Sequence, residues 1–438
     1  MTPAVGYTEM RDSGIEWVGK IPKEWKVTRM KTILQNVSEK NHPDATVLSL
    51  YRDLGVVPKN SRDDNHNVTS EDTSNYKFVR CGDLVINKMK AWQGSLAVSE
   101  FEGIVSPAYY VCKFISNSTD KKYLHYLLRC RPYAQEFERL STGMRVGQWD
   151  LGIDDFLRIP VICPSISEQT AIAAYLDIQC AKIDEIIAEA KASIEDYKQW
   201  KASIIYEAVT KGLDPNAEMK DSGIEWMGEI PAGWALAPFK YVLTERRERN
   251  VPIKSTERLS LSIDLGVTLY SEKTTNLDRF KEDFKQYKIA YKGDLVMNSM
   301  NMIVGASGVS NYFGCVSPAY YTFYDNTQNH VTAKYCEYIF RSKALLRVLH
   351  NLGKGIYSIE RGDDRVNTCR LKVPKENLGR IMLPLPSENI QERIVNYLNK
   401  MCAEIDTLVT AKQALIADLE SYKKSLIYEV VTGKRRVC

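Results

Sequence analysis

Three short groups of acidic residues are the places where metal-dependent chemistry could be sought in this sequence. Asp283-Phe284-Lys285 resembles the carboxylate pattern of nucleases, but it has no partner carboxylate nearby in a predicted strand. Asp154-Asp155 and Asp363-Asp364 precede predicted helices, where a carboxylate stabilises the first turn. We therefore expect helix-capping or solvated roles for the two pairs, with no catalytic residue and no metal site.

Other residue types that bind metals or act as nucleophiles are scattered. The ten cysteines form no Cys-x-x-Cys pair, and none has zinc-ligand spacing to the five histidines. Motifs for P-loop nucleotide hydrolysis, zinc peptidases, serine hydrolases and dinucleotide binding are absent. The Asn/Asp-Pro-Pro-aromatic tetrapeptide of amino-group DNA methyltransferases is absent too. The sequence thus predicts a chain that is not an enzyme and binds no cofactor.

The net charge of +4 says little about a polyanionic partner, but the charge is unevenly distributed. Residues 233–385 contain 23 lysines and arginines against 15 acidic residues, whereas residues 164–216 contain 5 against 9. Phosphate binding depends on local positive surface. No apolar run approaches the roughly 18 residues of a membrane span, and residues 1–10 lack a signal-peptide pattern. We expect a cytoplasmic protein without a membrane partner.

The sequence contains an internal repeat, because the same short blocks occur in the same order in both halves. Asp-Ser-Gly-Ile-Glu-Trp occurs at Asp12–Trp17 and again at Asp221–Trp226. Three further blocks, Leu-Ser-Leu with Asp-Leu-Gly-Val, Gly-Asp-Leu-Val, and Val-Ser-Pro-Ala-Tyr-Tyr, recur with one shared offset of 211 residues. A last block begins at Pro164 and recurs at Pro386, so the second half holds eleven more residues before it. Such self-similarity predicts two modules of one fold whose surfaces have diverged.

The last block of each half predicts a long helix. Its apolar or long side chains alternate in steps of four and three, which is a heptad seam. The seam residues are Ile183, Ile187, Ala190, Ile194, Tyr197, Lys201, Ile204 and Ala208, then Ile405, Val409, Lys412, Ile416, Leu419, Lys423, Leu426 and Val430. We expect the two helices to pair as an intramolecular coiled coil. Lys201 and Lys423 occupy equivalent positions, and either fix the register or extend from the seam into water.

The remaining stretches mix short β-like runs with helical ones. Asp83–Asn87 and Ala108–Phe114 are predicted strands, and Lys121–Leu140 and Thr332–Leu352 are predicted to be helical. The fold class is therefore α+β: two tandem mixed domains separated by long helices, related by a pseudo-twofold repeat. The predicted boundaries are 1–163 for the first domain, 164–216 for its helix, 217–385 for the second domain and 386–438 for its helix. The Ser-Pro-Ala-Tyr-Tyr tyrosines are expected in core and rim packing rather than base stacking.

Over its entire length the chain resembles the specificity subunits of type I restriction–modification systems. The resemblance rests on the duplicated order of Asp-Ser-Gly-Ile-Glu-Trp, Ile-Pro and Trp, Gly-Asp-Leu-Val, Ser-Pro-Ala-Tyr-Tyr, and the Tyr-Leu, Ile-Asp and Ile-Tyr-Glu positions of the helices. It implies two target recognition domains, each reading one part of a bipartite double-stranded DNA target. The helices would space the domains and dock two methyltransferase subunits, and restriction subunits would join them. S-adenosylmethionine, ATP and Mg²⁺ are then expected on those partner subunits.

Direct readout of bases requires Arg, Lys, Asn or Gln side chains in the major groove, and two places in each half offer them. The first is the loop after each Gly-Asp-Leu-Val strand, and the second is the polar turn before the last helices of each half. The candidates are Asn87, Lys88, Lys90, Trp92, Gln93, Thr142, Arg145 and Gln148, then Asn298, Ser299, Asn301, Lys354, Tyr357, Arg361 and Arg365. Phosphate contacts usually outnumber base contacts, so some of these side chains would position the DNA without specifying it.

Two other interpretations remain open. The chain could be a restriction nuclease or methyltransferase with unrecognised motifs, which S-adenosylmethionine binding or DNA cleavage by the isolated chain would reveal. It could instead be a repeat scaffold that bridges proteins through the coiled coil. A neighbouring adenine methyltransferase gene would favour the specificity subunit over the scaffold.

Overall fold

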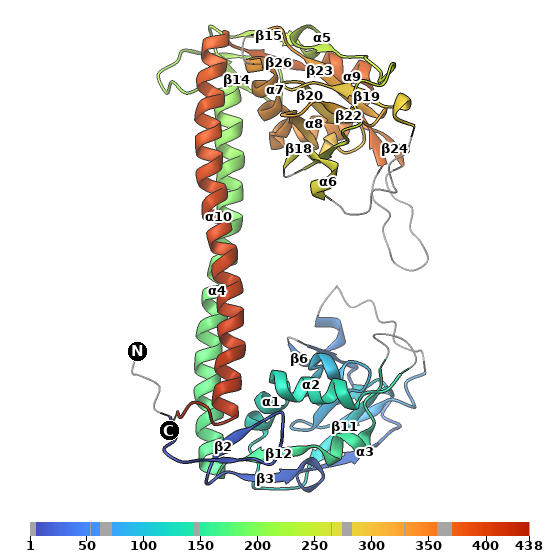
Figure 1. Cartoon of the computed structure of the whole chain (residues 1–438), viewed down its shortest axis with the longest axis vertical. Coiled ribbons are helices and arrows are strands. Elements are labelled where there is room, and N and C mark those ends of the chain that lie inside the picture. Colours follow the sequence, from blue (N-terminus) through green and yellow to red (C-terminus); the bar gives the residue numbers. More distant parts are fainter. Residues whose placement is uncertain are drawn as a thin grey trace. The chain divides into compact units, whose positions relative to one another are not determined.

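The computed structural model describes residues 6–52, 54–61, 72–143, 149–263, 265–273, 283–327, 330–356 and 370–437. The chain folds into two compact units (Figure 1). The first unit contains Met1–Lys191 and Gln413–Cys438, and the second contains Ala192–Lys412. The helix that follows each domain in the sequence therefore begins in one unit and ends in the other.

A four-stranded antiparallel sheet lies at the centre of each unit. In the first unit its order is β4 (Leu34–Val37), β11 (Tyr109–Phe114), β8 (Leu84–Asn87) and β9 (Leu96–Val98). The second unit repeats this order with β16 (Thr244–Glu245), β23 (Tyr320–Tyr324), β20 (Leu295–Asn298) and β21 (Ser307–Val309). The predicted strands at Asp83–Asn87 and Ala108–Phe114 are confirmed, and so are the α+β class and the internal repeat.

Two short helices pack against each sheet, where one helix was predicted. The first pair is α1 (Lys121–Arg129) and α2 (Arg131–Leu140), and the second is α7 (Val331–Arg341) and α8 (Lys343–Leu352). Cys130 interrupts the first pair with an extended backbone, φ −70° and ψ 153°, and Pro132 follows in the first turn of α2, where its missing N–H is tolerated. Ser342 interrupts the second pair and caps α8 through its hydroxyl.

Paired short strands complete each unit. In the first unit the antiparallel pairs are β1 (Met10–Asp12) with β2 (Lys20–Pro22), β3 (Lys26–Arg29) with β12 (Pro160–Cys163), β5 (Leu48–Tyr51) with β6 (Gly55–Pro58), and β7 (Lys77–Val79) with β10 (Gly103–Val105). Their counterparts are β13 (Met219–Asp221) with β14 (Glu229–Pro231), β15 (Ala235–Pro238) with β26 (Met382–Leu385), β17 (Leu259–Ser262) with β18 (Gly266–Leu269), and β19 (Lys288–Ala290) with β22 (Gly314–Val316). The second unit also contains β24 (Lys354–Ile356) paired with β25 (Arg370–Lys372). The remaining short helices are α3 (Ile153–Arg158), α5 (Phe239–Val242), α6 (Tyr270–Lys273) and α9 (Lys375–Arg380).

The two long helices are α4 (Ile166–Thr210) and α10 (Glu388–Val431), and they pair as predicted (Figure 1). All sixteen predicted seam residues are buried or half-buried. In the first unit Lys423 Nζ lies 2.6 Å from Asp184 Oδ1, and in the second Lys201 Nζ lies 2.7 Å from Asp406 Oδ1. Earlier residues of α4 thus meet later residues of α10, so the helices are antiparallel. Both seam lysines form ion pairs across the seam.

The end of each long helix is built into the core of a unit. Tyr123 Oη of α1 donates a hydrogen bond to the Val431 carbonyl at the end of α10, at 3.2 Å. Tyr335 Oη of α7 donates in the same way to Val209 near the end of α4, at 3.1 Å. Each unit consequently combines one domain with the beginning of one long helix and the end of the other.

Candidate nucleic-acid interface

The loops that follow β8 and β20 have the same backbone frame. We call them the strand-end loops (residues 87–95 and 298–306). The Asn87 side-chain Oδ1 accepts the Met89 N–H at 3.2 Å, and the Asn298 Oδ1 accepts the Met300 N–H at 3.1 Å. A 3₁₀ turn follows in each loop, Ala91–Gln93 or Met302–Val304. Asn87 and Asn298 therefore use their amide oxygens to hold the loop, and a contact between them and DNA stays a prediction.

The other candidates of the first strand-end loop differ in exposure. Lys90 and Gln93 are exposed, so they are free to approach a ligand. Trp92 is half-buried: its Nε1–H donates to the Met89 carbonyl at 3.1 Å, and its ring lies 5.3 Å from that of Trp149. Trp92 can thus pack against its neighbours, but the indole N–H, which is the only donor of its side chain, is already engaged.

In the second strand-end loop, Asn301 is exposed and Ser299 is fully buried. The Ser299 hydroxyl has no hydrogen-bond partner among the described residues. Its backbone carbonyl accepts the Val373 N–H at 3.0 Å. Ser299 therefore packs inside this loop, and Asn301 is its accessible candidate.

The polar turns after α2 and α8 form the second candidate region, and we call them the helix-end turns (residues 141–151 and 353–373). Thr142 is exposed and pairs with Asp150 through two backbone hydrogen bonds of 3.1 and 2.8 Å. Lys354, also exposed, lies opposite Lys372 where β24 pairs with β25. The candidates Arg145, Gln148, Tyr357, Arg361 and Arg365, together with Asp363-Asp364, lie outside the described residues.

The strand-end loop and the helix-end turn meet in both units. Lys88 Nζ lies 2.6 Å from Asp150 Oδ2, and this hydrogen bond raises the pKa of the lysine. In the second unit the contact is the Ser299–Val373 hydrogen bond just beyond β25. Two regions that are about 50 to 70 residues apart in the sequence thus contact each other in each unit.

Lys77 and Lys288 are functional candidates that the sequence reasoning missed. The Lys77 Nζ donates to the Tyr109 carbonyl at 2.5 Å and lies 5.4 Å from the Tyr110 ring centroid. Lys288 makes the same hydrogen bond with the Tyr320 carbonyl at 2.7 Å. The sequence did contain an indication of their role, because the two lysines are separated by the same 211 residues as the repeated blocks. A single lysine in a stretch that has otherwise diverged is, however, difficult to recognise as part of the repeat.

Further cations surround these two lysines. Burial lowers the pKa of Lys288, and Lys375, Arg249 and Lys372 lower it further by charge repulsion. Burial likewise lowers the pKa of Lys77, with smaller contributions from Lys40 and Lys88. Glu245 offsets part of this charge through its ion pair of 3.0 Å with Lys375. Lys375, Arg249 and Lys372 thus lie close enough to Lys288 to repel it, which is the kind of local positive charge that phosphate binding uses.

Comparison with known proteins shows which proteins this chain resembles. Residues 22–196 match the family model of the type I restriction modification DNA specificity domain. Over its whole length the chain is similar to the specificity subunits of type I restriction enzymes. The MjaVIII specificity subunit of Methanocaldococcus jannaschii is 21% identical, and the alignment covers 95% of this chain and 94% of that protein. The StySPI specificity subunit of Salmonella potsdam is also 21% identical, over 95% and 90%.

Solved structures support the same fold. The HsdS subunit of Thermoanaerobacter tengcongensis aligns with a TM-score of 0.51 at 15% identity, over 94% of this chain and 98% of that one. A chain from a study of complex assembly and conformational transition of the type I R-M system aligns with a TM-score of 0.66 at 14% identity, over the same shares. The likeness extends over both units and both long helices. The matched DNA specificity domain and the related specificity subunits, rather than the fold, support a sequence-specific DNA-binding role.

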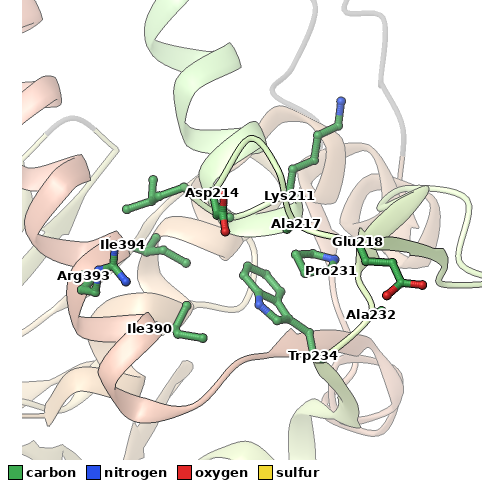
Figure 2. A pocket seen from close by; sticks show the side chains of 13 residues that line it. Lys211, Asp214, Ala217, Glu218, Pro231, Ala232, Trp234, Ile390, Arg393 and Ile394 are labelled. Carbon is green, nitrogen blue, oxygen red and sulfur yellow. The ribbon is translucent and has the colours of Figure 1, made fainter.

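The second unit also contains a cavity of about 380 Å³ between the helix ends and β14 (Figure 2). Trp234 lies at its centre, with Ile390 and Ile394 of α10 on one side and Pro231 on the other. A corresponding cavity of about 470 Å³ occurs in the first unit, where Tyr7 packs edge-on against Trp25. Neither cavity includes residues of the strand-end loops or the helix-end turns.

The acidic groups considered for metal chemistry have structural roles where they are described. The Asp283 carboxylate caps a 3₁₀ turn by accepting the Lys285 N–H at 3.1 Å. Asp154 and Asp155 lie inside the first turn of α3 rather than before it, and no side chain caps this helix by a hydrogen bond. Their charges are favourable at a helix N-terminus. Within the described residues, no group of three or more His, Cys, Asp or Glu could hold a metal ion. No helix in the described part of the chain is long and apolar enough to cross a membrane.

Proposed function

We propose that each unit of this specificity subunit reads one part of a bipartite DNA target, without catalysing a reaction itself. The observation that carries the proposal is the pairing of a strand-end loop with a helix-end turn in both units. Their backbone frames agree, whereas their exposed polar side chains differ: Lys90 and Gln93 in one, Asn301 in the other. Two units that have the same fold but expose different polar side chains can recognise two half-sites of different sequence.

We further propose that the coiled coil docks two methyltransferase subunits. Two apolar positions on its surface are repeated at the 222-residue offset: Ile186 with Leu408, and Trp200 with Tyr422. All four side chains are between 43% and 46% exposed. Each unit contains one residue of each pair, so two equivalent apolar surfaces are available for two copies of one partner.

Mapping methylated adenines in cells tests the reading function. Cells with the partner methyltransferase subunits and this chain should methylate a split motif, and cells without this chain should not. The purified chain alone should neither methylate nor cut DNA. Methylation of the same motif without the chain would contradict the proposal, and turnover by the pure chain would support the enzyme interpretation instead.

A matched pair of variants tests the docking proposal. Trp200→Ala with Leu408→Ala should reduce the number of methyltransferase subunits in the purified complex from two to one, as measured by native mass spectrometry. Lys198→Ala, an exposed position on the same helix, should leave two. If the double variant keeps both subunits, these side chains are not the docking surface.

A further inference from the structure

Met89 and Met300 occupy the same place in the two strand-end loops and expose their side chains by 45% and 39%. A single exposed apolar side chain needs no explanation. Here, however, the methionine is kept in both halves, whereas its neighbours are not. Lys88 and Lys90 flank the first, and Ser299 and Asn301 flank the second. The surface feature that the two loops share is therefore an exposed apolar side chain, that of the methionine.

The backbone presents both methionines in the same geometry. The asparagine before each one accepts its N–H through Oδ1, at 3.2 Å for Met89 and 3.1 Å for Met300. The next residue closes the turn, with Lys90 N–H donating to the Asn87 carbonyl at 3.0 Å and Asn301 N–H to the Asn298 carbonyl at 3.1 Å. Because these bonds fix the turn before any ligand arrives, little further ordering of the loop is required on binding.

The surroundings favour DNA over a protein as the partner of these methionines. Lys88 and Lys90 lie next to Met89 in the chain, and Lys88 is paired with Asp150 whereas Lys90 is exposed. At the other strand-end loop, Lys288 donates to the carbonyl of Tyr320, which lies opposite Asn298 in the sheet. Such charge complements phosphates. An unbranched, flexible apolar side chain among cations can enter a duplex between two base pairs, which are themselves apolar on their faces.

We propose that Met89 and Met300 insert between base pairs, one in each half-site, next to the polar side chains that read base identity. The proposal rests on the DNA-reading function of the two units. The two half-sites differ in sequence. A residue common to both loops is therefore suited to separating two stacked base pairs rather than to recognising one particular base. The exposed polar residues of each loop, Lys90 with Gln93 in the first and Asn301 in the second, would supply the difference between half-sites.

The test uses the complete complex with its methyltransferase subunits and duplexes of the methylated motif. The fluorescent base 2-aminopurine, which brightens when unstacked, is placed at successive positions of each half-site. With the unaltered protein, fluorescence should rise at one position in each half-site. Met89→Ala should abolish the rise in one half-site only and weaken binding about tenfold, which corresponds to about 1.4 kcal/mol. Met300→Ala should do the same for the other half-site.

Conservative variants and salt dependence complete the experiment. Met89→Leu and Met300→Leu keep an apolar side chain and should retain most of the fluorescence and affinity. The salt slope of binding should stay the same in all variants, because no phosphate contact is removed. Unchanged affinity and fluorescence in both alanine variants would overturn the proposal. So would loss of methyltransferase subunits with intact DNA signals, which would assign the methionines to a protein interface. If the unaltered complex does not bind the duplex, the proposed reading function fails instead.

Discussion

The Lys201 ammonium lies 2.7 Å from both carboxylate oxygens of Asp406 on the opposing helix. The same pair recurs in the other unit as Lys423 with Asp184. Each half of the chain thus supplies one lysine and one aspartate, and each lysine meets the aspartate of the other half. A slide of the helices by one heptad would separate Lys201 from Asp406 while leaving apolar seam residues facing each other.

Charge exchange tests this ion pair. Lys201→Glu should destabilise the chain, because it places two carboxylates together, and adding Asp406→Lys should restore much of the loss. The pair is partly exposed, with the lysine side chain at 31% and the aspartate at 61%. We therefore expect a coupling energy of only about 0.2–1 kcal/mol from a double-mutant cycle of urea unfolding. A coupling of zero would remove the pair as a determinant of register.

Gly433 allows the end of α10 to reach the first unit. Its φ is +70°, and an added Cβ would lie 2.3 Å from Pro22 Cδ. Gly433→Ala should therefore be destabilising by about 1–3 kcal/mol beyond the cost of the left-handed backbone. Gly19 is the matched control, because its φ is +71° and its Cβ would meet no atom within 4 Å. Equal unfolding free energies for Gly433→Ala and Gly19→Ala would contradict this close approach.

His125 should make the first unit sensitive to mild acid. Burial, together with a smaller contribution from the nearby Arg129 guanidinium, lowers the pKa of His125 to about 4. Between pH 6.5 and 4 the unfolded chain therefore binds a proton that the folded chain does not, so stability falls as pH falls. The loss attributable to this residue is about 3 kcal/mol by pH 4. His125→Gln should lose less stability than the unaltered chain over this range, and parallel pH profiles in thermal unfolding would refute the assignment.

The length of the coiled coil should influence the gap between the half-sites. Seven residues inserted after Ala190 keep the seam aligned and add about 10 Å of helix, at roughly 1.5 Å per residue. The gap in the methylated motif should then grow by up to about three base pairs, at about 3.4 Å each. Two inserted residues rotate the seam by about 200° and should instead reduce folding or assembly. An unchanged gap in an active seven-residue variant would show that these helices do not set the distance.

The architecture was predictable where the sequence repeats itself. The shared offsets predicted two units of one fold, and the heptad steps predicted which faces of α4 and α10 are buried. The antiparallel direction and the Asp–Lys partners were not predicted, because a seam alone does not specify which residues lie opposite each other. Likewise, helical periodicity continues through Cys130 and Ser342, where the chain turns.

The location of the candidate site in the sequence was predictable, but the roles of its individual residues were less so. The two loops of each unit were selected from their polar composition, and contacts that depend on the fold bring them together. Asn87 and Ser299 have suitable side chains for base readout, yet the first holds its own turn and the second is buried. Lys77 and Lys288 were missed because their role depends on a carbonyl 32 residues further along the chain.

The most direct test of the account is the methylated motif of loop variants, mapped genome-wide in cells with the partner subunits. Lys90→Ala with Gln93→Ala should relax one part of the split motif, and Asn301→Ala should relax the other. From the sequence, Arg361→Ala or Arg365→Ala should relax the same part as Asn301→Ala, with a loss of about 1–3 kcal/mol for a lost guanine contact. Lys424→Ala, an exposed lysine of α10, should leave the motif unchanged. The account is contradicted if each loop variant relaxes both parts equally, or if the motif is unchanged in all of them.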